Sequence, residues 1–371
     1  MTQHRADFEH NPWILLGAFG GVAVLLFALL KLTGGGADQQ AMDTTPTGTP
    51  GPAVVATDGP APAPSPTAAP TAPAHKVITP KATIKPNRSI QQLRAKVQAA
   101  DKTLTTTGPL GSISVPMGGP VTGSIMTSVA NIPNTHADRN WYNAIHALIA
   151  PSPDFVTLNE VYKHPTTGIE AAAPGYTAWR VETPDPTLGG PGPSMNNVVM
   201  WRTDRWDQLD GGRFKAVNDD NGFLMGKPFI WDRYAMWSIL KRKSDGAIVS
   251  LVSLHMPTNP VIYPQQHGHP GMSRVAKYNQ GMLAVTAMVN QLRRYGPVLL
   301  GGDMNSHPGQ GGWTAAAHMG ADGFTYAKDT GVMYLFYQSP ATVIAKRQIH
   351  IFSDHPAIIT TLAMNGSGPV Q

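Results

Sequence analysis

The segment PVLLGGDMN, residues 297–305, carries the pattern that decides the fold class. A short apolar run is followed by two glycines, and then by a carboxylate and an amide two residues apart. Such a run, ending at glycine and Asp, predicts a buried strand that stops in a loop. Asp303 and Asn305 are therefore candidate site residues, because polar loop residues after strands gather at one rim of a sheet. Taken alone, the pair also fits an ordinary turn.

Three other apolar runs are bounded by polar residues in the same way. Glu160 follows the run DFVTLN, His255 ends VSLH, and the pair Asp354-His355 stands just before the last apolar run. Each of these alone is a weak signal, since a carboxylate at a strand end is more often simply solvated. Their order and contexts together are far more specific than any one of them, and they predict a shared site.

The pattern from residue 125 onward predicts a strand-rich chain with few helices. This order favours α/β layers with much antiparallel pairing. We expect the tryptophans 201, 206, 231 and 237 in the core rather than on a base-stacking surface. Strands are expected over 125–131, 154–159, 196–201, 235–241, 248–254, 297–301, 333–337 and 357–362, and helices over 138–150 and 273–295.

The composition excludes several kinds of chemistry. The 371 residues include no cysteine, which rules out disulfides, thiolate zinc sites, iron–sulfur clusters and a cysteine nucleophile. Any metal must bind to oxygen or imidazole. The sequence has neither a P-loop nor a GxSxG elbow. The net charge of +5 is concentrated before the domain, since residues 120–371 carry 19 Lys and Arg against 17 Asp and Glu.

The amino-terminal part predicts a membrane attachment. Residues 13–30 form an uncharged, mostly apolar run of 18 residues, nearly long enough to span a bilayer. Residues 44–80 contain ten prolines among Thr, Ala, Gly and Ser, a composition that cannot bury a core. We expect a single-pass anchor with the carboxy-terminal domain on the extracytoplasmic side. Secretion after cleavage of a signal peptide is the alternative.

The expected domain organisation follows from these shifts in composition. A basic amphipathic helix is expected before the domain, with the apolar stripe Ile90, Leu93, Val97, Ala100 and Leu104. The segments are a polar tail over 1–12, a transmembrane anchor over 13–32, a Pro/Thr/Ala/Gly-rich linker over 33–86, the helix over 87–105, and a catalytic domain over 120–366.

From about residue 124 to residue 364 the chain resembles the endonuclease/exonuclease/phosphatase superfamily, the DNase I-like fold. Its Pro/Thr/Ala stalk resembles those of exported actinobacterial proteins. The segments that carry the first resemblance are SVAN (128–131), LNEV (158–161), NNVVMWRTDRW (196–206), SLHM (253–256), GGDMNS (301–306) and SDHPAI (353–358). The resemblance implies a four-layer α/β/β/α sandwich of two packed, largely antiparallel sheets.

The resemblance also implies a metal-dependent phosphoester hydrolase and gives each candidate residue a role. Mg²⁺ or Mn²⁺ would bind to Glu160, with Asp354 and Asn131 completing the metal and phosphate surroundings. Catalysis would use Asp303 to orient or deprotonate the attacking water and Asn305 to hold the water or a phosphate oxygen. The remaining catalytic residues are His255 and His355, which would contact the phosphate.

Two positions depart from the family pattern. Met333 stands where the family has the Asp that holds the catalytic histidine, and a thioether cannot orient an imidazole. Asp329, four residues earlier, is a candidate substitute. The second glutamate of the family has no clear match, and Glu170 and Glu182 are the candidates.

Three functions remain open from the sequence. We expect a nuclease acting on nucleic acid, to which the basic segment 76–102 would add phosphate contacts. The alternatives are a phosphatase or phospholipid phosphodiesterase acting on the membrane, and a degenerate domain kept as a binding module, suggested by Met333.

Overall fold

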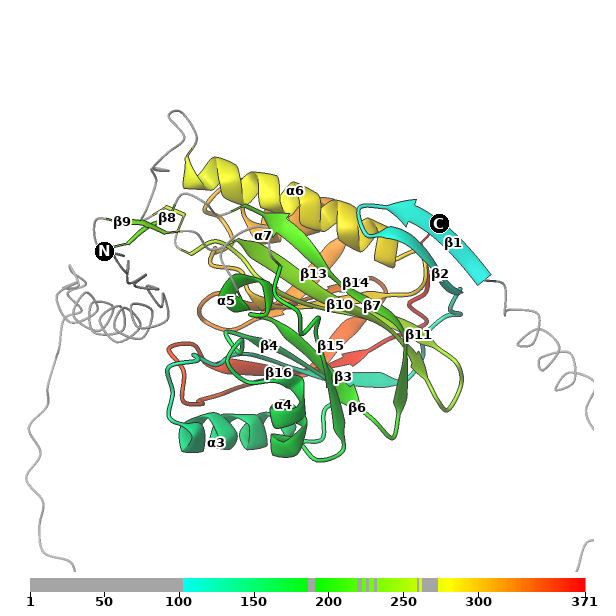
Figure 1. Ribbon diagram of the computed structural model, residues 1–371. Helices are drawn as coiled ribbons and strands as arrows, with labels where there is room; N and C mark the ends of the chain where they lie inside the picture. Colours follow the sequence, from blue (N-terminus) through cyan, green and yellow to red (C-terminus); the bar gives the residue numbers. More distant parts are fainter. Residues whose placement is uncertain are drawn as a thin grey trace, which may run out of the picture. The chain divides into compact units, whose positions relative to one another are not determined.

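Strands that are mostly apolar and, at the centre of each sheet, buried along nearly their whole length form two sheets that pack face to face (Figure 1). The computed structural model describes residues 103–185, 191–218, 222–224, 227–229, 232–258, 260–261 and 273–370. All of these lie in the compact unit Ser89–Gln371. The first sheet has the order β13 (Phe324–Lys328), β14 (Met333–Gln338), β12 (Val298–Asp303), β11 (Ile248–His255), β10 (Arg233–Arg242), β7 (Trp206–Val217). The second has the order β15 (Thr342–Ile349), β16 (Ala357–Ala363), β3 (Ser124–Asn131), β4 (Phe155–Asn159), β6 (Val198–Arg202), β5 (Tyr176–Trp179).

The layer between the two sheets is a closely packed apolar core. Gly301 shows how near the sheets approach, because a Cβ at this residue would lie 2.3 Å from Oγ1 of Thr157 on the other sheet. Gly302 has a φ of 152°, which L side chains rarely adopt, so both glycines of the GGDMNS segment have a structural reason. Buried members of this layer include Ile125, Val129, Phe155, Val199, Leu251, Leu299, Leu335, Ile358 and Leu362.

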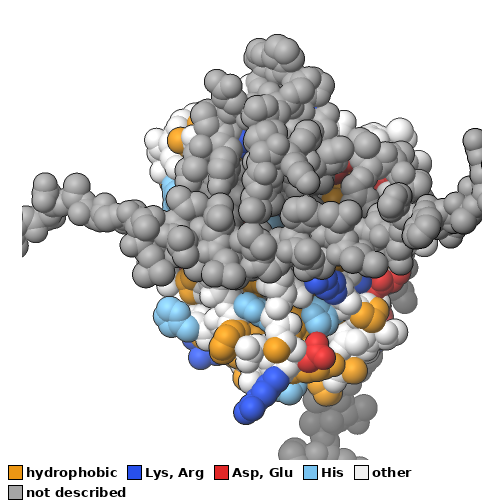
Figure 2. Space-filling view, turned by 60° about the vertical axis from the view of Figure 1, so that its left-hand side comes forward, with side chains coloured by type: hydrophobic (Ala, Val, Ile, Leu, Met, Phe, Trp, Pro, Cys, Tyr) orange, Lys and Arg blue, Asp and Glu red, His pale blue; other side chains and the backbone are white. Residues whose placement is uncertain are grey.

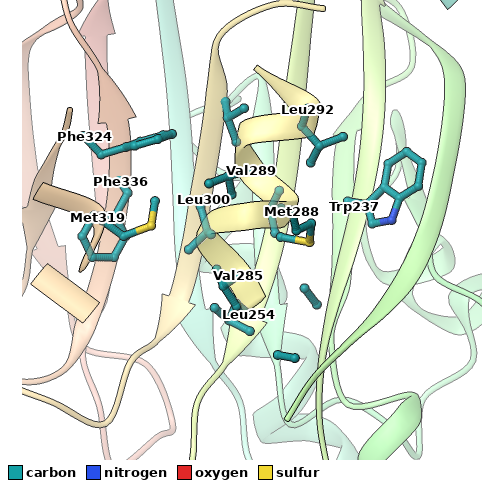
Figure 3. Close-up of a cluster of buried hydrophobic side chains, with 14 of the residues drawn as sticks. Trp237, Leu254, Val285, Met288, Val289, Leu292, Leu300, Met319, Phe324 and Phe336 are labelled. Carbon is teal, nitrogen blue, oxygen red and sulfur yellow. The ribbon is translucent and has the colours of Figure 1, made fainter. Parts of the chain in front are cut away.

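Helices cover the outer face of each sheet, which gives four layers (Figure 1). The helix α6 (Arg274–Leu292) begins where the Ser273 side chain accepts a hydrogen bond from the N–H of Ala276. With α7 (Ala315–Ala321) it covers the first sheet; α3 (Asp138–Ile149) and α4 (Thr166–Ala172) cover the second. Figure 3 shows the α6 side chains Val285, Met288, Val289 and Leu292 beside Trp237, Leu254 and Leu300 of the first sheet.

Short elements complete the fold. The hairpin of β1 (Thr103–Gly108) and β2 (Gly111–Pro116) packs on the carboxyl end of α6, where Gln291 accepts from Leu110 N and donates to the carbonyl of Gly111. The hairpin adds Ile113 and Val115 to the core under α6. The packed domain therefore begins before residue 120, where its boundary was expected. The remaining short elements are α5 (Pro191–Ser194), β8 (Gly222–Leu224) and β9 (Lys227–Phe229).

The expected architecture is confirmed, including all eight expected strands and both helices, with ends shifted by a few residues. The tryptophans 201, 206 and 237 are buried, as expected of core residues, whereas Trp231 lies outside the described residues. The helix expected over 87–105 is wrong at its end. Leu104 lies in β1, paired with Val115, because the hairpin offers it a strand partner and a place beside the α6 core.

The segments expected over residues 1–86 and most of the segment expected over 87–105 lie outside the described residues, and this includes the apolar run over 13–30 and the linker. Within the described part of the chain, no helix has the length and apolarity needed to cross a membrane.

Candidate active site

Four polar residues meet at one end of the layer between the sheets because each is the last residue of its strand. Asn131 ends β3 and Asn159 ends β4, and these parallel strands pair Asn131 with Asn159. His255 ends β11 and Asp303 ends β12, which are also parallel and pair His255 with Asp303. Parallel neighbours finish at the same edge of a sheet, so the two sheets bring all four side chains together.

Asn159 joins the two sheets under the site. Its Oδ1 accepts from the N–H of Asp303 at 2.9 Å, and its Nδ2 donates to Asn197 Oδ1 at 2.7 Å and Ser253 Oγ at 3.2 Å. Asn197 in turn donates to the carbonyl of Tyr234. Since Asn159 is fully buried, these bonds fix the backbone of Asp303 against the opposite sheet.

Asp303 lies between two imidazoles. Its Oδ2 is 3.4 Å from Nε2 of His355 and 3.8 Å from Nε2 of His255. Burial raises the pKa of Asp303 to about 6, although the attraction of His355 and the N–H of Asn305 oppose the rise. The carboxylate is therefore ionised at neutral pH and able to take up a proton, which is the property a general base needs.

His255 is a neutral imidazole in the folded protein. Burial, together with the positive charges of Arg233 and His355, holds its pKa well below the usual value. Nδ2 of Asn196 lies 3.1 Å from Nδ1 of His255. With the Asn196 NH₂ donating to Nδ1, the imidazole proton lies on Nε2, the nitrogen that faces Asp303.

Glu160 carries its carboxylate on a strained backbone. Its backbone is left-handed, with φ of 62°, which is uncommon for a residue other than glycine and is found at functional sites. Burial and the negative charge of Asp354 raise its pKa to about 7, while a hydrogen bond from the Asn131 side chain opposes the rise. The Asp354 side chain is 53% exposed and lies 3.5 Å from Nε2 of His355.

Asn305 follows Asp303 in the left-handed region, with φ of 47°. Its N–H donates to Asp303 Oδ1 at 2.8 Å, and its Nδ2 donates to the carbonyl of Met256 at 3.0 Å. The short turn therefore orients the carboxylate of Asp303 and holds the Asn305 amide beside the end of β11. The structure thus places all seven sequence candidates at the ends of β3, β4, β11 and β12 or on the turn before β16.

Met333 is fully buried in the layer between the sheets, at the position that pairs with Asp303. Asp329, 4% exposed, accepts from the N–H of Met333 through Oδ1 at 3.0 Å, and its Oδ2 is buried without a hydrogen-bond partner. Burial raises the pKa of Asp329, and the positive charge of His355 opposes this rise, so the two groups are close enough to interact.

The two candidates for the second glutamate of the family bond to other groups in the structure. Glu170 accepts from the N–H of Ala178, and Glu182 pairs with Arg180 at 3.1 Å. Both carboxylates thus form bonds at the second sheet. The side chain that contacts Nδ1 of His255 is the amide of Asn196.

Sequence reasoning missed the buried polar residues behind the site, Asn159, Asn196, Asn197 and Arg233. The adjacent amides at 196 and 197, directly before a strand, were the available signal. Arg233 carried none, since it precedes an apolar strand as many basic residues do. In the structure it is 4% exposed, and its charge acts on Glu160, Asp303 and His255.

Glu160 and Asn131 fit a hard divalent cation. Burial raises the pKa of Glu160 although Asn131 and Arg233 oppose the rise, and Asn131 Oδ1 is buried without a hydrogen-bond partner. Within the described residues, no three His, Asp or Glu side chains are arranged to hold a metal ion together. Proteins commonly bind Mg²⁺ through one or two carboxylates, with water and substrate phosphate as further ligands.

Comparison with known proteins identifies the family. The model of the endonuclease/exonuclease/phosphatase family matches residues 128–325, more than half of the chain. A search of curated proteins finds no match. The endonuclease/exonuclease/phosphatase from Bacteroides vulgatus is 16% identical with a TM-score of 0.50, and the match covers 65% of this chain and 98% of that one.

Two further solved structures are similar. The human Nocturnin catalytic domain with bound sulfate is 14% identical, with 66% and 95% coverage and a TM-score of 0.48. D. rerio TDP2 complexed with single-strand DNA product is 12% identical, with 65% and 99% coverage and a TM-score of 0.46. At 16% identity and a TM-score of 0.50, the Bacteroides vulgatus structure shows a shared fold. The family match over residues 128–325, which include GGDMNS, shows the family. The chain belongs to the endonuclease/exonuclease/phosphatase family, whose members are hydrolases of phosphoester bonds.

Proposed function

We propose that this protein is a divalent-metal-dependent phosphodiesterase that cleaves nucleic acid. The observation that carries the proposal is the position of Asp303, a buried carboxylate between two imidazoles and close enough to the Glu160 carboxylate for their charges to interact. Hydrolysis of a phosphodiester needs a base for water and hydrogen-bond donors or positive groups for the phosphate oxygens. This cluster supplies both within one rim.

The proposed reaction is attack of water on phosphorus. An O–P bond forms, the ester P–O bond breaks, the water proton passes to Asp303, and the leaving oxygen takes a proton from solvent. His255 donates its Nε2–H to a phosphate oxygen, and His355 stabilises the charge that develops there. Glu160 and Asn131 would hold Mg²⁺ or Mn²⁺, which when bound neutralises phosphate charge.

The test uses the full chain with Mn²⁺ or Mg²⁺ against plasmid DNA, RNA, phospholipids and inositol phosphates. Cleavage of nucleic acid that EDTA abolishes is expected, and Asp303→Asn should remove it. Asp207→Asn is the matched control, because that side chain is 62% exposed on β7 and pairs only with Lys243 at the surface. Activity confined to phospholipid or inositol phosphate would overturn the choice of substrate, and undiminished activity in EDTA would overturn the mechanism.

We further propose that the domain works outside the membrane, with residues 13–32 as its anchor. The apolar run and the proline-rich stretch support this placement. Protease added to intact cells should release a fragment that begins within about 37–120, and full protection of the domain would overturn the orientation.

A further inference from the structure

Phe352 presents an aromatic ring to solvent on the turn that carries His355. It is 58% exposed, whereas its neighbour Ile351 packs against the core under α3. The turn is ordered by Ser353, whose N–H donates to the carbonyl of Ile351 at 2.7 Å and whose Oγ accepts from the N–H of His355 at 3.2 Å. One exposed Phe needs no special explanation. Its place two residues before Asp354, on a turn held in this way, gives it a fixed position beside the site.

The surroundings of Phe352 come from the loops after β3 and β4, the two strands of the second sheet that end at the site. The His136 ring lies 5.8 Å from the Phe352 ring at 87°, an edge-to-face contact. His136 belongs to the loop after Asn131, and that loop is tied to the next, after Glu160, by the bond from Lys163 N to Asn134 Oδ1 at 3.0 Å. Lys163 is exposed. Phe352, three residues before His355, is therefore braced by His136, and the loop of His136 is tied to the loop that carries Lys163.

We propose that Phe352 stacks on the nucleobase next to the phosphodiester that is cleaved, so that the substrate is recognised by a base as well as by its phosphate. This inference rests on the proposed function and names the recognition element of the same site. An aromatic face stacks on every base, which gives affinity without choosing a sequence. Lys163 is placed to attract a neighbouring phosphate of the same strand.

The surroundings favour a base over a lipid surface. A segment that enters a membrane interface buries a broad apolar face. Here the exposed ring contacts the imidazole of His136, whose loop also carries Asn134 and is bonded to the loop of Lys163. Figure 2 shows a face of the molecule on which histidine, hydrophobic and charged side chains are interspersed. A single braced ring next to a polar group has the area to stack on one nucleobase but not to enter a lipid surface.

The experiment compares two oligonucleotides that differ in one nucleobase. One carries normal bases throughout, and the other has an abasic tetrahydrofuran at the nucleotide beside the cleaved bond. The full chain is assayed with Mn²⁺ as wild type, Phe352→Ala and Phe352→Trp. Wild type should show a KM for the normal strand at least about fivefold below that for the abasic strand. Phe352→Ala should remove this difference and leave kcat unchanged, and Phe352→Trp should restore it.

Ile344→Ala is the control, because Ile344 is 60% exposed on β15 but sits toward the end of the strand that pairs with Ala363, away from the site. It should leave both KM values unchanged. An equal rise of both KM values in Phe352→Ala would overturn the inference while the phosphodiesterase activity stands. So would an unchanged KM together with weakened binding to phosphatidylserine vesicles. Failure of wild type to cleave either strand would instead overturn the proposed function.

Discussion

Replacing Glu160 with Gln should stabilise the metal-free protein at high pH while it removes activity. The folded state holds a proton on Glu160 up to a pH of about 7, whereas the free side chain releases it near 4.5. Between these values the folded state binds more protons than the unfolded chain, so stability falls as pH rises, and the whole penalty is present above pH 7. The difference corresponds to up to about 3 kcal/mol, at about 1.4 kcal/mol per pKa unit.

The assay is urea denaturation of wild type and Glu160→Gln in EDTA at pH 4 and pH 8. The free energies of unfolding of the two proteins should agree at pH 4, where the Glu160 carboxyl of wild type is mostly protonated and therefore neutral like the amide of the variant. At pH 8 the variant should be the more stable. Added Mn²⁺ should stabilise wild type, by about 2.7 kcal/mol at a hundred times its Kd, and the variant much less. Hydrolysis by the variant should fall at least about a hundredfold.

Glu182→Gln is the matched control for this experiment. Although burial opposes it, hydrogen bonds from Thr166 and Arg180 lower the pKa of Glu182, so its replacement gives no gain in stability at pH 8. The reasoning is refuted if Glu160→Gln is less stable than wild type at pH 8 in EDTA, or if Mn²⁺ stabilises both proteins equally.

Three further substitutions test other parts of the site. Asp303→Asn should abolish turnover but spare binding of a fluorescent oligonucleotide, whereas an equal loss of both would make Asp303 a structural residue. Asn159→Ala should lower the free energy of unfolding by about 3 kcal/mol in urea titrations, because it leaves the Asp303 N–H and the Asn197 amide oxygen buried and unpaired; a loss under 1 kcal/mol would contradict this. Met333→Asp should raise turnover per folded molecule at some cost in melting temperature. A fall in turnover at an unchanged melting temperature would show that Asp329 already orients His355.

The elements that carry the site were predictable because their sequence signal is local. In β4, β11 and β12 an apolar run ends in a polar residue, and this boundary is visible without any knowledge of the partner strand. The strands that were missed lack such a signal. Nearly every residue of β15 is exposed, and β7 contains Gly211 and Gly212, whose place in a strand is decided by pairing with β10.

The site was predictable in its residues but not in its connections. His255 and Asp303 could be predicted because each ends an apolar run. Which group contacts Nδ1 of His255, in contrast, depends on how the second sheet is placed over the first. That placement brings Asn196 to the imidazole and Asn159 under Asp303. A buried amide bonded in this way looks in the sequence like any other polar residue before a strand, so only packing shows its part.

The hairpin at residues 103–116 has a practical consequence for handling this protein. It binds the carboxyl end of α6, and at the same end Gly118 donates to the carbonyl of Tyr295 and Val370 to that of Arg293. The reacting groups lie at the other end of the eight-residue β11, roughly 25 Å away. Both ends of the described domain thus lie at the end opposite the site, and Figure 1 shows β1 and the C-terminus next to each other. A bead, tag or fusion partner joined at either end would leave the substrate rim open to solution, and an immobilised enzyme should keep its full turnover.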